Sequence, residues 1–239
     1  MIIDCNATLG NWPFRRLRHS TPEDFVRLMD DYGITQAWAG SFEGIFYRDA
    51  GEANRILASA VSAHADRLRP WAAINPAFPA WEDDLKEAVE LGFLGLRLYP
   101  NYHGYTLSDT CADELFSAAL HAKLPVTVYH KVQDERLHHP QMVVLPTDMT
   151  LLPLVQRYPE LPVICCGLSA HLLTAELCSA VAGGSVYLDI SRWEGIGGVE
   201  LLVKKVGARQ VLFVSHSPEV VELADARIQL GAAEGAIDE

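Results

Sequence analysis

Short apolar segments alternate with single amphipathic segments eight times along the chain, and this repetition constrains the fold more than any other feature. The apolar segments predict β-strands at 1–5, 34–40, 68–75, 93–99, 126–130, 162–168, 186–191 and 211–215. Strict alternation of strands and helices is typical of parallel strands joined by right-handed helical crossovers. Eight such units in 239 residues predict an α/β fold, one closed (β/α)8 TIM barrel, as a single domain of residues 1–239.

Local signals support the helices and weaken the main alternative, an open doubly wound sheet. Thr21 can cap a helix N-terminus, Pro22 suits the first helical turn, and Gly33 can end the helix. Ser217-Pro218-Glu219 repeats this start signal before the last predicted helix. No dinucleotide-binding or P-loop glycine pattern follows a predicted strand, which disfavours the open sheet.

Composition excludes several classes of partner. The net charge of −12 disfavours nucleic acid and anionic membrane surfaces, because both would repel the chain. The five cysteines are odd in number and form no CxxC pair, so we expect core thiols in a reducing compartment. The start of the chain shows no signal-peptide pattern, and we expect a cytoplasmic protein. The expected partner is a small-molecule substrate, with a homodimer through the outer helices as an open alternative.

Polar residues at the strand ends are the candidate site, because TIM-barrel active sites lie at the C-terminal ends of the strands. Arg97 lies within an apolar strand, where a charge is costly to bury unless an anion pairs with it. Either a substrate carboxylate or a salt bridge with Asp4 or Asp189 would satisfy it. His130 ends the fifth predicted strand and His216 follows the eighth, and neutral imidazole can act as general acid or base near pH 7.

Four segments in their order along the chain resemble the amidohydrolase-related group of metal-dependent hydrolases, the branch that contains decarboxylases and lactonases. They are Ile3-Asp4-Cys5-Asn6-Ala7-Thr8-Leu9-Gly10, Gly95-Leu96-Arg97-Leu98-Tyr99-Pro100, Val128-Tyr129-His130 and Leu212-Phe213-Val214-Ser215-His216-Ser217-Pro218. The resemblance covers nearly the whole chain and implies a (β/α)8 barrel with lactonase or decarboxylase chemistry.

The resemblance also places the family's metal ligands on this sequence, and most of them are replaced. The two first-strand histidines fall on Asn6 and Thr8, the sixth-strand histidine on Gly167, and the eighth-strand aspartate on His216; only His130 remains. A hydrolytic zinc site needs about three protein ligands, and Asn and Thr are poor ones. We therefore expect no cofactor and disfavour zinc or another divalent metal. If a metal binds, the predicted ligands are His130, His216 and Asp4.

Two functional hypotheses follow. In the first, the protein is a hydrolase of this group that acts on a small carboxylate-bearing substrate without the usual zinc site. His130 and His216 are then catalytic, Arg97 orients the carboxylate, and the further substrate-binding residues are Asn6, Tyr99, Ser215, Trp12 and Arg192. In the second, the protein is a non-catalytic barrel that binds a small molecule or serves as partner subunit of an active relative.

Overall fold

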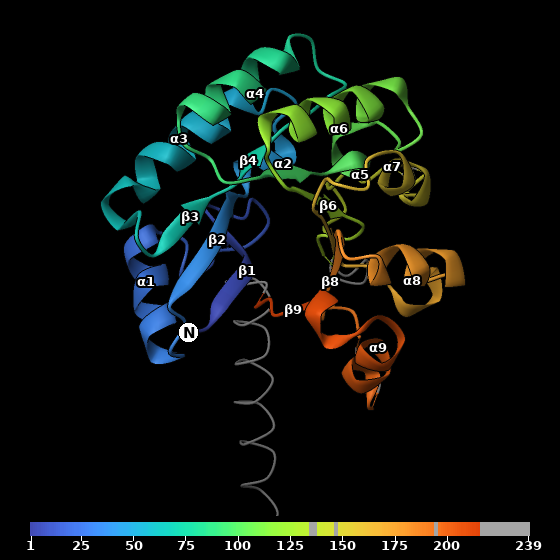
Figure 1. Ribbon diagram of the computed structural model, residues 1–239. Helices are drawn as coiled ribbons and strands as arrows, with labels where there is room; N and C mark the ends of the chain where they lie inside the picture. Colours follow the sequence, from blue (N-terminus) through green and yellow to red (C-terminus); the bar gives the residue numbers. More distant parts are fainter. Residues whose placement is uncertain (134–137, 146–147, 194–195, 216–239) are drawn as a thin grey trace, which may run out of the picture.

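The strands of the computed structural model are all parallel and form the wall of a barrel (Figure 1). The structure describes residues 1–133, 138–145, 148–193 and 196–215. The strands are β1 (Ile3–Leu9), β2 (Gln36–Ser41), β3 (Leu68–Pro70), β4 (Ala72–Ala73), β5 (Leu96–Leu98), β6 (Val126–Tyr129), β7 (Val163–Cys166), β8 (Val186–Asp189) and β9 (Val211–Leu212). One sheet has the order β1-β2-β3 and the other the order β4-β5-β6-β7-β8-β9.

β3 and β4 are two halves of the single strand that the sequence predicts at 68–75. Trp71, which lies between them, donates its backbone N–H to Ala39 on β2 at 2.8 Å. The next N–H, that of Ala72, donates to Gly95 before β5 at 2.9 Å. Pro70, before Trp71, already accepts the N–H of Leu94 at 3.0 Å, so the strand lies between β2 and β5, and nine assigned strands fill eight positions. Cys5 donates to the carbonyl of Phe213 at 3.2 Å and so links β1 to the chain after β9, which confirms the (β/α)8 barrel.

In the described part of the chain, seven helices cover the outside of this wall (Figure 1). They are α1 (Pro22–Asp31), α3 (Gly51–Val61), α4 (Trp81–Glu90), α6 (Thr110–Ala122), α7 (Leu152–Arg157), α8 (Ala175–Ala182) and α9 (Gly198–Val206). The Thr21 hydroxyl accepts the N–H of Asp24 at 3.2 Å, as the start signal predicts. The helix predicted after Ser217 lies outside the described residues. No helix in the described part of the chain has the length and apolar character needed to cross a membrane.

Two short helices at the carboxyl ends of the strands were not predicted. α2 (Glu43–Phe46) follows β2, and α5 (Pro100–His103) follows β5. His103 joins them, because its Nε2 lies 3.1 Å from the carbonyl oxygen of Gly44. Segments this short carry too few residues for a helical period, so the sequence pattern could not reveal them.

Alternation along each strand separates the core into two parts. Leu96 and Leu98 of β5 pack outward in the core under the helices, whereas Tyr99 at the end of the same strand packs inside the barrel. β6 repeats the pattern, with Val128 outside and Tyr129 inside. Successive side chains of a strand point to opposite faces, so every second residue enters the lumen. The same alternation directs the side chain of Arg97, between Leu96 and Leu98, into the barrel interior.

Candidate functional site

Arg97 is a buried cation in the barrel interior. The residue is 1% exposed, and its Nη2 donates to the carbonyl of Trp38 at 2.6 Å. Its Nη1 lies 3.4 Å from the Thr8 hydroxyl. The guanidinium lies against Gly40 of β2, where an added Cβ would come within 2.5 Å of Nη1. A glycine at position 40 is therefore what leaves room for the guanidinium.

No carboxylate among the described residues forms an ion pair with Arg97. This finding removes the salt bridge with Asp4 or Asp189 as an explanation of its burial. Burial opposes the charge, but Tyr129, Tyr99 and Cys166 nearby hold the pKa of the guanidinium above its ordinary value. Within the described part of the chain its Nε also has no hydrogen-bond partner. Arg97 therefore remains a buried cation whose neighbours are neutral.

Two tyrosines connect Arg97 to Asn6. The rings of Tyr99 and Tyr129 stack with centroids 4.6 Å apart, and the Arg97 Cζ lies 5.8 Å from the Tyr129 centroid. The Tyr129 hydroxyl donates to Oδ1 of Asn6. Burial raises the pKa values of both phenols, so both stay protonated at neutral pH. The predicted residues Asn6, Arg97 and Tyr99 thus meet through Tyr129, which sequence reasoning did not select although its place one residue before His130 signals the lumen.

Asp4 holds the seam between the first and last strands. Its Oδ1 accepts the N–H of Asn6 at 3.1 Å and the N–H of Ser215 at 3.0 Å, and its Oδ2 accepts the Ser215 hydroxyl. The carboxylate is fully buried. Ser215, predicted to donate to substrate, therefore directs its hydroxyl to Asp4. Asp4, predicted as a fallback metal ligand, is engaged in closing the barrel.

His130 follows β6 and lines a small pocket of mixed polar and apolar side chains. Its backbone N–H donates to Cys166 at 2.8 Å, which fixes it at the end of β6. Burial lowers the pKa of its imidazole to about 4, so the ring is neutral at pH 7. The pocket has a volume of about 330 Å³, and Asn101, Tyr102, Gln133 and His138 also line it. Gln133, buried and polar, was not predicted.

An aromatic cluster covers the mouth beside this pocket. Trp12 packs edge-on against Phe42 at 5.2 Å and against Phe46 at 5.3 Å between ring centroids. Phe14 lies 5.9 Å from Trp12 and stacks on His139 at 4.9 Å. Trp12 itself is buried. Trp12 was predicted to bind substrate, and the aromatic contacts of its ring here are with protein side chains.

A second buried carboxylate, Asp189 at the end of β8, lies near His130. It accepts the N–H of Gly167 at 3.1 Å and the hydroxyl of Ser191 at 2.7 Å. Gly167 has φ +70°, and an added Cβ would lie 2.3 Å from the carbonyl oxygen of Lys131. A side chain at the sixth-strand position is therefore sterically excluded. Arg192, predicted to bind substrate, is partly exposed beyond β8 and does not share in the hydrogen bonds of Arg97. His216 lies outside the described residues.

Solved structures share this barrel. A 5-carboxyvanillate decarboxylase of Novosphingobium aromaticivorans, crystallised with manganese, matches with a TM-score of 0.67 and 15% identity over 91% of this chain and 87% of that chain. A dihydroxybenzoic acid decarboxylase of a Polaromonas species, also with manganese, gives 0.65 and 15% over 91% and 86%. A probable 2-pyrone-4,6-dicarboxylic acid hydrolase of Acinetobacter baumannii, with citric acid bound, gives 0.59 and 14% over 91% and 84%. No curated protein sequence matches the chain.

These structures correct the prediction that no cofactor is involved. Two decarboxylases of the same fold hold manganese, so a divalent metal belongs among the groups that such a barrel binds, and the expectation of no metal is contradicted. The donors in the described part of this chain do not fit the usual three-ligand centre. They include no group of three or more His, Cys, Asp or Glu side chains that could hold a metal ion. Asn6 and Asp4 are held by Tyr129 and Ser215, and Gly167 offers no donor atom.

The evidence for the family comes from the whole length of the chain. The family model described as amidohydrolase matches residues 3–227. The same residues build the closed parallel barrel and bring His130 and Arg97 to its carboxyl-terminal half. The chain belongs to the amidohydrolase family.

Proposed function

We propose that the protein is an enzyme that acts on a small carboxylate-bearing substrate with lactonase- or decarboxylase-type chemistry. The observation that carries this proposal is the Arg97 guanidinium, which is 1% exposed and has no carboxylate partner in the described residues. Burying a cation without a counter-ion costs on the order of several kcal/mol, even after the surrounding protein has relaxed. A guanidinium presents a planar fork of donors that matches a carboxylate. A bound carboxylate would therefore satisfy the charge that the fold leaves uncompensated.

His130 supplies the second group of the proposed site. Because its imidazole is neutral at pH 7, it is suited to donate a hydrogen bond to a substrate carbonyl or to accept a proton, but not to act as a fixed cation. The pocket of about 330 Å³ at His130 is of the size that suits a small ligand. Asn6, oriented by Tyr129, and His216 complete the set of proposed participants.

The relatives support the class of substrate. The similar solved structures include decarboxylases of dihydroxybenzoate and 5-carboxyvanillate and a probable hydrolase of 2-pyrone-4,6-dicarboxylic acid. Each of these molecules carries a carboxylate, which is the group that the Arg97 guanidinium is suited to bind. Because two of the similar structures hold manganese, an assay must include samples with added manganese.

An assay of the purified protein on these three carboxylates tests the proposal. Each is offered to protein as prepared, after chelation, and after addition of manganese, with carbon dioxide release and loss of pyrone absorbance as readouts. We expect turnover of one class, and we expect Arg97→Met to remove it. Arg69→Met is the matched control, because Arg69 on β3 donates to the carbonyl of Ala65, outside the Arg97 cluster.

The outcomes separate the two hypotheses. Turnover that survives Arg97→Met unchanged would overturn the role of Arg97. A rise in Tm with carboxylates, without turnover under any metal condition, would instead favour a non-catalytic binding barrel.

A further inference from the structure

Four unpartnered polar atoms gather in the pocket beside His130. Within the described part of the chain, the side-chain atoms of this pocket that are buried and lack a hydrogen-bond partner are Asn101 Oδ1, His130 Nδ1, Gln133 Oε1 and His138 Nε2. Folded proteins pair nearly all of their buried polar groups, because an unpaired group loses its hydration and gains nothing in return. The four atoms therefore need partners that a molecule bound in this cavity of about 330 Å³ would supply.

Backbone hydrogen bonds hold the walls that carry these atoms. Asn101 lies on α5, and its backbone carbonyl accepts the N–H of Leu145 at 2.8 Å. The imidazole of His130 hydrogen-bonds the backbone of Met149. His130 is 8% exposed and Gln133 is 7% exposed. The walls are thus held by the fold itself, and a preformed pocket of this kind binds a ligand at a lower cost in ordering.

The hydrogen-bonding character of the four atoms indicates the chemistry of their missing partners. The side-chain oxygens of Asn101 and Gln133 can only accept hydrogen bonds. The imidazole of His130 is neutral at pH 7, because burial lowers its pKa to about 4, and a nitrogen of a neutral imidazole accepts or donates according to the tautomer. A hydroxyl group both donates and accepts, so it matches the amide oxygens and either tautomer. Two or more hydroxyl groups on one ligand would therefore satisfy the pocket.

The remaining walls of the pocket disfavour charged ligands. The described residues that line it include Lys131 and no Asp or Glu, so a cation would find no counter-ion there. A carboxylate only accepts hydrogen bonds and would oppose the amide oxygens. Two imidazoles with two amide oxygens fall short of the three His, Cys or carboxylate ligands of a usual zinc site. Val132, Val144 and Met149 offer apolar surface to the carbon skeleton of a neutral ligand.

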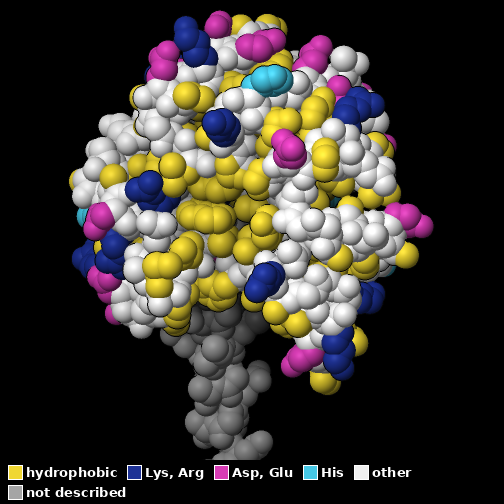
Figure 2. Space-filling model, in the orientation of Figure 1, with side chains coloured by type: hydrophobic (Ala, Val, Ile, Leu, Met, Phe, Trp, Pro, Cys, Tyr) yellow, Lys and Arg dark blue, Asp and Glu magenta, His cyan; other side chains and the backbone are white. Residues whose placement is uncertain are grey.

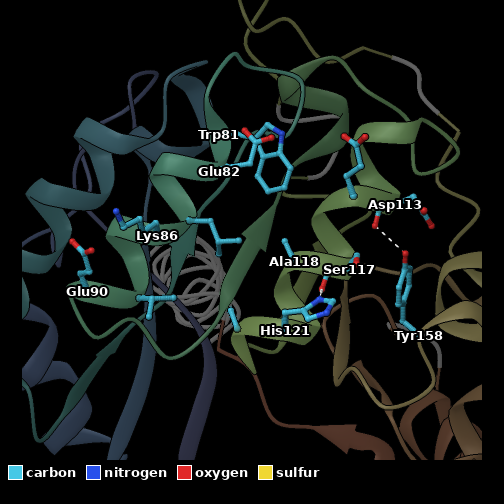
Figure 3. Close-up of a pocket in the computed structure, with 13 residues that line it drawn as sticks. Trp81, Glu82, Lys86, Glu90, Asp113, Ser117, Ala118, His121 and Tyr158 are labelled. Atoms are coloured by element: carbon cyan, nitrogen blue, oxygen red, sulfur yellow. Dashed lines mark hydrogen bonds between the residues drawn. The ribbon is translucent and has the colours of Figure 1, made fainter.

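Two larger hollows differ from this pocket in their polar atoms. Figure 3 shows a groove of about 890 Å³ between α4 and α6. There the Tyr158 hydroxyl donates to the backbone carbonyl of Asp113 at 3.2 Å. Figure 2 shows hydrophobic side chains gathered in the middle of one face, and a groove of about 660 Å³ at α1 and β1 is lined mainly by apolar residues. No residue that lines either groove contributes to the unpartnered buried atoms of the described residues, so unmet hydrogen bonds distinguish the pocket at His130 from both.

We propose that the pocket at His130 binds a neutral molecule with at least two hydroxyl groups, which donate to the side-chain oxygens of Asn101 and Gln133. The same hydroxyl groups pair with the imidazoles of His130 and His138. Arg97 is not among the described residues that line this pocket. The inference therefore goes beyond the proposed carboxylate site and does not depend on turnover. An aliphatic polyol and an aromatic diol share this chemistry, and separate probes distinguish them.

Calorimetric titration of the full chain with neutral probes tests the binding. Catechol carries two hydroxyl groups on a ring, 1,2-difluorobenzene has the same ring without a donor, and erythritol is the aliphatic probe. We expect catechol or erythritol to bind, and 1,2-difluorobenzene not to bind at the same concentration. No heat with either diol up to about 10 mM would leave water as the occupant and overturn the proposal. Binding of 1,2-difluorobenzene as tight as that of catechol would overturn it too, because the hydroxyl groups would then contribute nothing.

Gln133→Met tests which side chain receives the ligand, with Gln141→Met as the matched control. Gln141 is exposed and does not line the pocket. We expect Gln133→Met alone to weaken binding of the diol about fivefold or more. The same variant should raise the Tm of the free protein, because apolar atoms replace an unpaired buried acceptor. Equal affinities of the two variants, or a lower Tm in Gln133→Met, would overturn the proposal.

Two further variants separate the remaining outcomes. Asn101→Leu repeats the measurement at the second amide if Gln133→Met does not fold. A rise in Tm with manganese or zinc alone, present in wild type and lost in His138→Gln, would assign the pocket to a metal and overturn the hydroxyl ligand. Carboxylate turnover and diol binding are measured separately, so absence of turnover counts against the proposed function alone.

Discussion

Two buried charged residues of the barrel interior, Asp4 and Arg97, are satisfied in different ways. Asp4 is fully buried, and its oxygens accept three hydrogen bonds, from the N–H groups of Asn6 and Ser215 and from the Ser215 hydroxyl. Arg97 is equally buried, but it donates to one carbonyl and one hydroxyl and has no carboxylate partner among the described residues. A buried charge whose hydrogen bonds are all made stabilises the fold. A buried charge without a counter-ion is costly, and binding a ligand of opposite charge would offset that cost. The first charge is structural, and the second marks the proposed site.

Removing the Asp4 carboxylate should break the hydrogen bonds that join β1 to Ser215, and we expect the largest loss of stability from this change. Asp4→Ala removes the carboxylate that accepts three hydrogen bonds from Asn6 and Ser215, at about 1–3 kcal/mol for a buried donor. We expect the free energy of unfolding to fall by about 3 kcal/mol or more, measured by urea denaturation. Asp66→Ala, at an exposed aspartate, is the control. Equal losses in the two variants would show that the seam does not depend on Asp4.

A substitution at Gly40 crowds the Arg97 guanidinium and so tests how tightly the barrel interior packs around this charge. In Gly40→Ala the new Cβ would lie 2.5 Å from Nη1 of Arg97, so we expect a loss of about 2 kcal/mol from overpacking. In an Arg97→Ala background the same substitution should cost at least about 1 kcal/mol less, because the clash is absent. Additive losses in this double-mutant cycle would contradict the contact.

Lowering the pH should destabilise the folded protein through His130, whose imidazole is buried in its neutral form. Its pKa is about 4 in the folded protein and near 6.5 when unfolded, so the unfolded chain binds the extra proton between these values. Stability is therefore full above about pH 6.5 and declines as the pH falls toward 4, by about 2 kcal/mol between pH 7 and pH 5. His130→Gln should remove this share of the pH dependence, and His121→Gln, at an exposed histidine, should not. An unchanged pH profile in His130→Gln would refute the depressed pKa.

The smallest effect is expected at the link between the tyrosine pair and Asn6. Tyr129→Phe removes the hydroxyl that donates to Asn6 but keeps the ring that stacks on Tyr99. We expect a loss of about 1 kcal/mol in unfolding free energy. Carboxylate affinity should change by less than it does on replacement of Arg97. A larger change in affinity at Tyr129 would move the centre of the site away from the guanidinium.

Much of the fold was readable from local pattern. Alternation of strands and helices predicted the barrel, and the lone charge in strand 93–99 predicted a buried guanidinium in need of an anion. The Asp4–Ser215 link joins residues 211 positions apart, which no local period encodes.

The candidate site was predicted only in part. Strand position singled out Asn6, Arg97, Tyr99 and His130 as candidates, and the structure joins the first three of them through Tyr129. Tyr129 and Gln133 were missed, because a tyrosine in an apolar strand and a glutamine in a loop give no distinct signal. The expectation of no metal was wrong because it judged one chain's ligands without the manganese found in structures of the same fold.

Carboxylate binding by Arg97→Met tests the role of the unpaired guanidinium most directly. Calorimetric titration of wild type and variant with 2,6-dihydroxybenzoate and with its methyl ester, with and without manganese, separates the charge from the ring. We predict that wild type binds the acid and not the ester. The variant should bind the acid about 30-fold or more weakly, with its unfolding free energy equal to or above that of wild type, because the cost of burying the cation is removed. Equal affinity of the two proteins for the acid would contradict the proposed role of Arg97.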